Sequence, residues 1–202
     1  MWIGLGRGAS KGVTGMIVFN KKLWVFTETT IDVINGSNPA MMRADPYSRG
    51  LGCIAPGSIA VGADSLFFLS ADGPCKITTD GALHRIYKPI EPIFTHDYPS
   101  GISTTIRANS DALSGAQGIV WKSRYMVAFP EVGNTTNSRV LVWHDVYGGF
   151  TSLTMPAKFW FRPERRVLLF WDYARDAWNA VDGKRDPGAN IPVLIQPTYN
   201  SL

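Results

Sequence analysis

Short apolar runs alternate with polar turns along most of the chain. The pattern is clearest in residues 20–36 and 62–81, where a polar turn leads into a nearly unbroken apolar run. In both stretches a short polar break follows, and a second run then ends at Asn35-Gly36 or at Asp80-Gly81. Asn-Gly and Asp-Gly favour the tight turns that join antiparallel strands. The two stretches therefore predict β-hairpins of one design.

The same design recurs at residues 118–129 and 159–170, so the chain contains an internal repeat. Two of the three spacings between successive buried runs fall in the range of roughly 40 to 45 residues that is typical of a propeller blade. The third spacing is longer, and the proline-containing segment 87–110 accounts for the excess. No helical period of apolar residues competes with the strand pattern.

The fold class that follows is all-β, a propeller-like array of about four antiparallel β-units. Each unit is too small to bury its own apolar face, so each is stabilised by its neighbours. The pattern is compatible with a small closed propeller, with an open stack of sheets and with part of a larger propeller. We expect a single domain over residues 1–202, with units near 13–50, 51–94, 101–153 and 154–202.

The composition suits a folded β-protein. Apolar residues make up 45% of the chain and charged residues 18%, so we expect a packed core. The formal net charge of +4 permits contact with nucleic acid without demanding it. No apolar run approaches the roughly 20 residues that span a bilayer, so membrane insertion is not expected. Cys53 and Cys75 fit no metal-binding spacing and are predicted to be free, buried thiols.

Recognisable catalytic and cofactor motifs are absent from the sequence. The glycine-rich segment 4–12 lacks the preceding strand and the following helix of a nucleotide-binding loop, so we expect a turn or loop there. The three histidines, His84, His96 and His144, do not have the spacing of metal ligands. We therefore expect no enzyme activity, no metal site and no cofactor.

Two features keep a carbohydrate-binding or glycan-processing function open. Glu28 with Asp32, or Asp172 with Asp176, would flank a glycosidic bond if the fold brought the members of a pair together. Most of the tryptophans lie within the strand repeats and are expected to pack in the core. The candidates for a platform on which a sugar ring stacks are Trp160 and Trp171.

Basic residues gather at the turns that open the buried strands. Three of the four units have two such residues there, and only the second unit, with Asp64, breaks the pattern. Equivalent turns of stacked blades project from one end of the body. The pattern thus predicts a basic end face that contacts DNA phosphates or an acidic neighbouring subunit, with solvated turn residues as the plainer alternative. The predicted contact residues are Lys21, Lys22, Lys122, Arg124, Arg165 and Arg166.

Residues 51–60 contain a distinctive run, Leu-Gly-Cys-Ile-Ala-Pro followed by Ser-Ile-Ala, that no general hairpin rule predicts. Residues 49–61, which contain this run, resemble tailed-phage virion proteins of the tail-nozzle or packaged-DNA-stabilisation type, as do residues 23–34 and 65–73. The resemblance is densest over residues 23–94, with a weaker echo over residues 125–153. Proteins of that family carry β-propellers and lie beneath the portal.

The resemblance implies a structural component of a bacteriophage tail that forms a ring of copies and lines or seals the DNA exit channel. The implied role is architectural, retaining packaged DNA and admitting it on ejection. The implied partners are other copies of the chain, portal-side and distal tail proteins, and packaged DNA through nonspecific contacts. The implied location is the virion, after synthesis in the host bacterial cytoplasm. A receptor-binding or glycan-processing propeller is the rival function.

Overall fold

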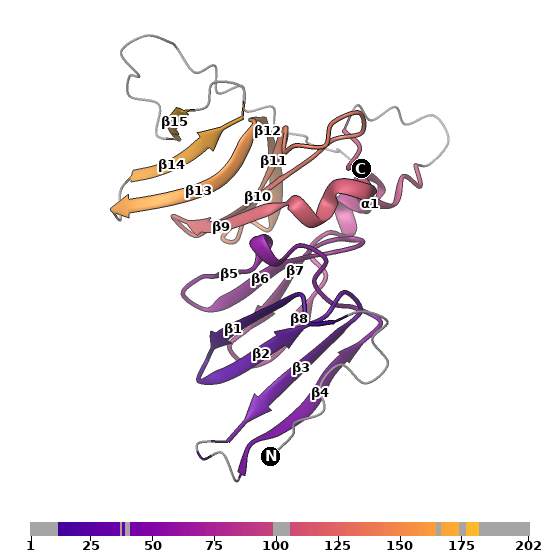
Figure 1. Cartoon of the computed structure of the whole chain (residues 1–202), viewed down its shortest axis with the longest axis vertical. Coiled ribbons are helices and arrows are strands. Elements are labelled where there is room, and N and C mark those ends of the chain that lie inside the picture. The colour runs from indigo at the N-terminus through magenta and orange to yellow at the C-terminus, as the bar shows by residue number, and fades with distance from the viewer. Residues whose placement is uncertain are drawn as a thin grey trace. The chain divides into compact units, whose positions relative to one another are not determined.

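The strands of the computed structural model form four antiparallel sheets (Figure 1). The chain divides into two compact units, residues 1–104 and 105–202, and each contains two of these sheets. The prediction of an all-β fold with four antiparallel units is therefore confirmed. The glycine-rich segment 4–12 lies outside the described residues except for Gly12. The structure describes residues 12–36, 38, 41–98, 106–164, 167–173 and 177–181.

Both sheets of the N-terminal unit are meanders in which consecutive strands pair side by side. The first consists of β1 (Gly15–Phe19), β2 (Lys22–Phe26), β3 (Thr30–Asn35) and β4 (Arg43–Arg49), in that order. The second consists of β5 (Ala60–Val61), β6 (Ser65–Ser70), β7 (Gly73–Thr78) and β8 (Leu83–His84), in that order. The 3-10 turns Pro56–Ser58 and Lys88–Ile90 and the short helix α1 (Glu91–Thr95) belong to the same unit.

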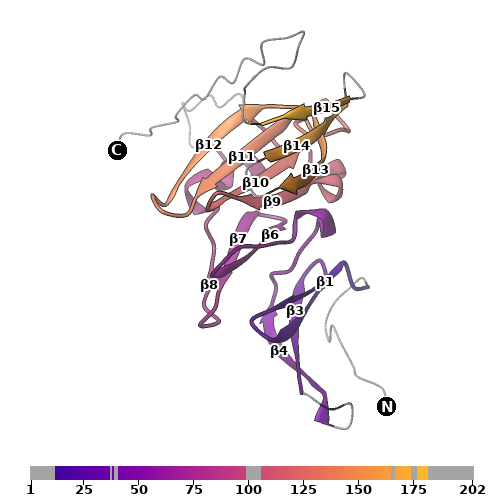
Figure 2. The same cartoon turned by 90° about the vertical axis from the view of Figure 1, so that its left-hand side faces the viewer.

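The C-terminal unit repeats this plan after a 3-10 turn at Ser110–Gly115. Its first sheet consists of β9 (Gln117–Trp121), β10 (Arg124–Phe129), β11 (Arg139–His144) and β12 (Gly149–Thr154), again paired in sequence order. Its second sheet, as far as it is described, consists of β13 (Ala157–Glu164), β14 (Val167–Asp172) and β15 (Ala177–Ala180). Figure 2 shows the sheets from the side.

Each sheet falls within the range of one predicted unit, except that β12 ends at Thr154, just past the expected boundary. A closed propeller is not seen among the described residues, and a single domain over residues 1–202 stays a prediction. The segment 87–110, which we expected to be a long connection, includes the Lys88–Ile90 turn and α1.

The sequence pattern did not predict strand β4. Its sequence, Arg-Ala-Asp-Pro-Tyr-Ser-Arg, is mostly polar and contains Pro46. Because β4 is an edge strand, it pairs with β3 alone, and a residue without an N–H group is tolerated there. The ladder is irregular next to Pro46, between Ile31 and Asp32. Because one edge of β4 has no neighbouring strand, β4 can form from mostly polar residues, and the hydrophobic pattern of the sequence does not predict it.

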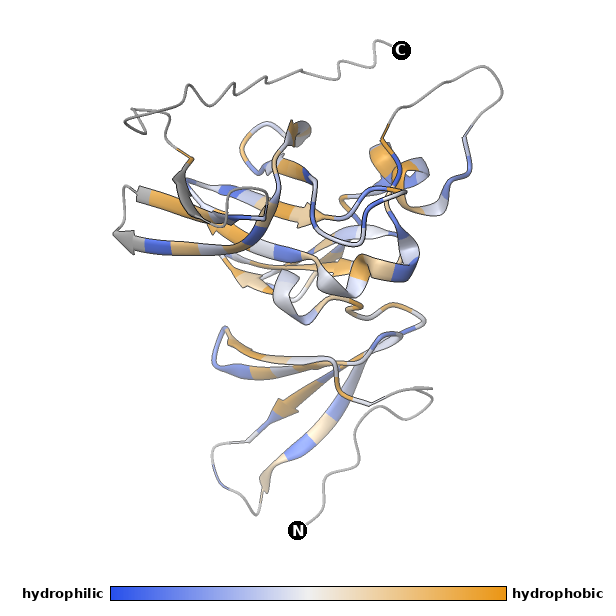
Figure 3. Ribbon diagram, turned by 45° about the horizontal axis from the view of Figure 1, so that its top comes forward, coloured by the Kyte–Doolittle hydropathy of each residue, from blue (hydrophilic) through white to orange (hydrophobic). Residues whose placement is uncertain are grey.

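The two sheets of the N-terminal unit share one hydrophobic core. Trp24 and Phe26 of β2 belong to the same buried cluster as Phe68 of β6, and the Phe26 and Phe68 ring centres are 5.1 Å apart. Hydrophobic residues, in orange, lie within the strands (Figure 3). Burying one large apolar side chain contributes about 1.5–3 kcal/mol, so this shared core is the main source of the unit's stability.

The connection between these two sheets is itself buried. Leu51, Cys53 and Ala55 are all inaccessible to solvent or nearly so. Gly52 is confined as well, because a Cβ atom at this position would overlap the backbone of Thr27 and Glu28. The connection therefore passes through the interior of the unit, where only small or apolar residues fit.

Backbone groups in such a buried connection need protein partners, since water does not reach them. The Cys53 N–H donates to the Thr27 carbonyl at 2.8 Å, at the turn between β2 and β3. The Ile54 N–H donates to the Leu69 carbonyl of β6 at 3.0 Å. The Ser58 hydroxyl in turn accepts the Leu69 N–H at 2.9 Å. The connection thereby hydrogen-bonds to both sheets.

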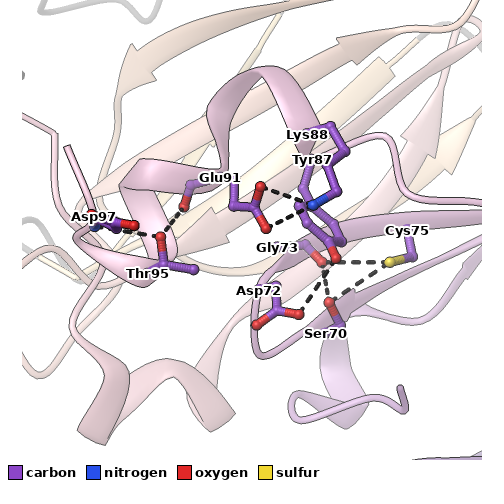
Figure 4. A network of polar contacts seen from close by, with 9 residues as sticks. All are labelled: Ser70, Asp72, Gly73, Cys75, Tyr87, Lys88, Glu91, Thr95 and Asp97. Carbon is purple, nitrogen blue, oxygen red and sulfur yellow. Dashed lines mark hydrogen bonds and ion pairs between the residues drawn. The ribbon is translucent and has the colours of Figure 1, made fainter. Parts of the chain in front are cut away.

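A second buried network closes the hairpin between β6 and β7 (Figure 4). The Ser70 hydroxyl donates to the Gly73 carbonyl at 2.7 Å, and the Cys75 thiol donates to Ser70 Oγ at 3.7 Å. The Tyr87 ring is buried, and its hydroxyl donates to Asp72 Oδ2 at 3.4 Å. Burial, together with the Asp72 carboxylate, raises the pKa of Tyr87 to about 12. Tyr87 is therefore a neutral donor at physiological pH.

The C-terminal unit has its own core. Leu168 and Phe170 of β14 pack with Met126 and Val142 of the preceding sheet. The buried Asn137 supports this packing, because its amide donates to the Ala157 carbonyl at 3.0 Å. Each pair of sheets is thus stabilised by apolar stacking and by buried polar groups that have partners.

We predict that Ser58→Ala lowers the free energy of unfolding by about 1–3 kcal/mol, because the Leu69 N–H would lose its buried acceptor. The variant would also remove the hydrogen bond to the Ala55 carbonyl at 2.6 Å. Urea unfolding followed by tryptophan fluorescence measures the change. Ser114→Ala, at an exposed position, is the control and should change stability by less than about 0.5 kcal/mol. Equal effects of the two substitutions would contradict this role for Ser58.

Both cysteines are free and buried, which confirms the prediction. Burial raises the pKa of Cys53 to about 11 and that of Cys75 to about 12. Since the thiolate is the reactive form, we predict that a thiol reagent modifies neither residue rapidly in the folded protein at pH 8. Both should react within the mixing time once urea unfolds the chain. Rapid modification of the folded protein would show that a thiol is accessible.

Candidate interaction surfaces

Two of the predicted basic turns are two-residue hairpin loops of the same type. The loop between β1 and β2 is Asn20-Lys21, with φ angles of 48° and 60°. The loop between β9 and β10 is Lys122-Ser123, with φ angles of 49° and 58°. Two successive left-handed residues make a type I′ turn, whose twist matches that of the flanking strands. Both hairpins therefore close without the glycine that this turn prefers.

The structure places the described basic residues in two pairs. Lys21 and Lys22 are exposed at the β1–β2 turn of the N-terminal unit, and Lys122 and Arg124 are exposed at the β9–β10 turn of the C-terminal unit. A common basic end face stays a prediction, because the two pairs belong to different units. The remaining predicted residues, Arg165 and Arg166, lie outside the described residues.

The β9–β10 turn carries its charge close to aromatic and imidazole groups. The ammonium nitrogen of Lys122 lies 4.1 Å from the centre of the Trp121 ring, which is a cation–π contact. Burial, and secondarily the Arg124 guanidinium, lowers the pKa of His144. The His144 ring also hydrogen-bonds to Thr151 Oγ1 at 3.0 Å. This histidine is therefore neutral at physiological pH and adds no charge to the turn.

The aspartates of the two acidic pairs that were candidates for glycosidic chemistry have buried positions where the structure describes them. Asp32 is buried and lies 3.4 Å from Arg49 Nη2, so its charge is balanced within the first sheet. Asp172 is buried at the end of β14, and Asp176 lies outside the described residues. In the described part of the chain, no group of three or more His, Cys, Asp or Glu side chains could hold a metal ion.

The two candidate stacking tryptophans have different surroundings. Trp160 packs against the core of the C-terminal unit, and its indole N–H donates to the Gln117 carbonyl at 3.1 Å. Trp171 lies on the other face of the same sheet, with its ring centre 6.2 Å from that of Phe159. Phe159 and Phe161 are exposed beside it. Of the two tryptophans, Trp171 lies on the face better suited to contact a ligand or a partner.

The outer face of the first sheet is also apolar. Met16 and Val18 alternate with the core-facing Ile17, and their side chains are 62% and 66% exposed. Their cross-strand neighbours on this face are the half-buried Leu23 and the buried Val25, so the exposed apolar surface is confined to the edge strand β1. Exposed apolar side chains that lie side by side are candidates for interaction. Met16 and Val18 on β1, and Phe159 and Phe161 on β13, are of this kind.

A groove of about 200 Å³ lies beside the β1–β2 turn in the N-terminal unit. It opens between the inner face of the first sheet and the β7–β8 turn, residues 79–82, of the second sheet. Two hydrogen bonds connect these parts: Asn20 Nδ2 donates to the Thr79 carbonyl at 2.8 Å, and the Tyr47 hydroxyl donates to the Gly81 carbonyl at 2.7 Å. The groove is thus framed by contacts between the two sheets.

Aromatic residues form the floor of this groove. Trp24 is buried, and its indole N–H donates to the Phe19 carbonyl at 3.1 Å. Tyr47 meets the Trp24 ring edge-on, with 4.8 Å between the ring centres and 82° between the planes. Burial, and secondarily the nearby Asp80 carboxylate, raises the pKa of Tyr47, so its hydroxyl stays protonated.

The walls of the groove are polar and carry both signs of charge. Asp45 Oδ2 accepts the Asn35 amide at 2.8 Å and lies 3.3 Å from the Arg43 guanidinium. Asp80 accepts hydrogen bonds from the Thr78 hydroxyl and the Ala82 N–H. These bonds lower the pKa of Asp80, which is therefore ionised at neutral pH. Lys22 adds a positive charge on the same lining.

Of these polar groove residues, only Lys22 was predicted from the sequence as a contact residue. Asp45 lies on the unpredicted strand β4, and Asp80 lies in a turn of the second sheet, so no local spacing connects them. Only the stacking of the two sheets brings both residues to one groove.

The chain matches no protein-family model, and no curated protein matches it significantly. In the described residues, no helix is long and apolar enough to cross a membrane.

We predict that Lys21→Gly raises the free energy of unfolding by up to about 1 kcal/mol, because glycine adopts the left-handed conformation without steric strain. Lys22→Gly is the matched control. It removes the same charge, but Lys22 lies in β2 and has no positive φ, so it should lower stability by about 0.5–1 kcal/mol. Urea unfolding distinguishes the two. Destabilisation by both substitutions would contradict the type I′ turn.

Proposed function

We propose that this protein is a structural component of a bacteriophage tail, which assembles with other copies of itself into a ring around the DNA exit channel. In this proposal the four sheets belong to a propeller-like array, closed within one chain or completed by neighbouring sheets. The resemblance of residues 23–34, 49–61 and 65–73 to tail-nozzle and packaged-DNA-stabilisation proteins supports the place in the virion.

The structural part of the proposal gains support from the segment that carries the resemblance. Its core, residues 51–60, is the buried connection whose backbone bonds to both sheets of the N-terminal unit. These contacts are architectural, since they hold β-units in a series. A rigid series of sheets is suited to lining or sealing a channel.

The observation that carries self-association is the presence of exposed apolar side chains on β1 of the first sheet and on β13 of the β13–β15 sheet. Val18 is 66% exposed on the first sheet, and Phe161 is 50% exposed on the β13–β15 sheet. Inside each unit, the opposite face of the same sheet is buried against another sheet. Contact with a second copy would remove these exposed side chains from water by the same kind of stacking.

Basic turns give the ring a means to contact DNA without reading its sequence. Lys21 and Lys22, and likewise Lys122 and Arg124, are exposed in pairs that phosphates can approach. The acidic surface of a neighbouring tail protein is the other partner that these turns fit. The rest of the mechanism is architectural and requires no catalytic group.

We predict that the purified full-length protein forms oligomers, and that Val18→Lys and Phe161→Lys each weaken self-association at least about tenfold by placing a charge in an apolar contact. Sedimentation velocity over a concentration series measures the association, and negative-stain images test for rings. Val132→Lys, at a 57% exposed valine outside the sheets, is the control and should assemble as the unaltered protein does. A protein that stays monomeric at every concentration and is absent from phage particles would refute the proposal.

A further inference from the structure

We propose that the groove between the first sheet and the β7–β8 turn binds a neutral saccharide, with one sugar ring held against Tyr47. The proposal concerns the N-terminal unit alone. It goes beyond the architectural function proposed above and does not depend on it. It also places a saccharide site far in the sequence from Trp160 and Trp171, the residues that the sequence pattern favoured for this role.

The shape of the groove limits the size of the ligand. Its volume of about 200 Å³ is smaller than the pockets of roughly 300–1,000 Å³ that enclose drug-sized molecules. The Asn20–Thr79 and Tyr47–Gly81 hydrogen bonds hold the first sheet and the β7–β8 turn together beside it. Because both contacts use backbone carbonyls, the groove is formed before any ligand arrives, which reduces the entropy lost on binding.

The polar groups on the walls match a ligand with several hydroxyl groups. A carboxylate has two oxygens that accept hydrogen bonds, and an amide presents both an acceptor and donors. Asp45 and Asn35 are oriented by their mutual bond at 2.8 Å, and Asp80 is oriented by the Thr78 hydroxyl and the Ala82 N–H. Each still has hydrogen-bonding capacity beyond these contacts. Neighbouring sugar hydroxyls, which both donate and accept, can use acceptors held in this way.

The balance of charge favours a neutral ligand over an ion. Lys22 and Arg43 bring two positive charges to the groove and its margin, and Asp45 and Asp80 bring two negative charges. An anion would meet the carboxylates, and a cation would meet Lys22. A neutral polyol avoids both penalties and can hydrogen-bond to all four side chains.

The floor supplies the apolar contact that a sugar ring needs. Tyr47 is half-buried and rests on the buried Trp24 ring, which holds it in place, and its hydroxyl is protonated. A tyrosine combines a large apolar area with a polar edge. The C–H face of a pyranose can pack against Tyr47 while its hydroxyl groups reach the polar walls.

The test is binding of the full-length protein to a panel of neutral sugars: glucose, galactose, mannose, rhamnose and N-acetylglucosamine. Nuclear magnetic resonance titration reports binding and location together, because the Trp24 indole N–H gives a separate signal. We expect at least one sugar to bind in the millimolar range and to shift that signal. Failure of every sugar to bind would overturn the proposal.

Two variants and their controls locate the site. Lys22→Met and Asp45→Asn keep the size of the side chain and should weaken binding about tenfold. Lys21→Met removes the neighbouring lysine, which does not line the groove, and should leave affinity within about twofold. Asp64→Asn, in an exposed turn of the same unit, is the control for the carboxylate. Circular dichroism verifies that each variant is folded.

Three further outcomes would also overturn this assignment. Equal losses in Lys21→Met and Lys22→Met would indicate a general charge effect. Loss of binding in Trp171→Ala, with Lys22→Met unaffected, would place the sugar on the C-terminal unit. Binding of acidic sugars or inorganic phosphate, but of no neutral sugar, would identify an anion site. Because none of these measurements requires assembly, a protein that binds sugar but stays monomeric and is absent from phage particles would refute only the proposed tail function.

Discussion

The N-terminal unit depends on one constraint, which is that the chain must pass from its first sheet to its second through the core. A buried connection can have neither bulky side chains where backbones meet nor polar groups without partners. Gly52 meets the first requirement, because a side chain there would overlap the Thr27 backbone. Ser58 helps to meet the second, since its hydroxyl accepts the Leu69 N–H. The segment is therefore distinctive in sequence for architectural reasons, without any catalytic role.

Stacking of sheets has a consequence at the outer faces. Within each unit, two sheets bury one face of each against the other, and apolar side chains remain on faces that this stacking does not cover. Val18 on the first sheet and Phe161 on β13 are examples. A repeated β-unit with apolar side chains left exposed on an outer strand is suited to association with more of its own kind. This property links the fold to the proposed ring of copies more directly than any single residue does.

The groove and the basic turns follow from the same arrangement. The type I′ turn at Asn20-Lys21 directs Asn20 to the Thr79 carbonyl, and Tyr47 reaches the Gly81 carbonyl from β4. These two hydrogen bonds join the first sheet to the β7–β8 turn of the second sheet, at the edge of their shared core. The groove lies beside them, and polar side chains form its walls. A scaffold held by its core can therefore carry a small polar site at its edge without loss of packing.

The sequence by itself determined the all-β class, the four antiparallel units and the two free thiols, because each depends on local patterns. Strand runs such as Leu66–Leu69 are recognisable from their own residues, and hairpins are recognisable from their turns. Strand β4 escaped detection because an edge position tolerates polar residues and Pro46. The convergence of Lys22, Asp45 and Asp80 was decided only by the tertiary structure, since these residues come from three separate turns and strands. Local patterns specify how each hairpin forms, but the packing between sheets decides which side chains meet.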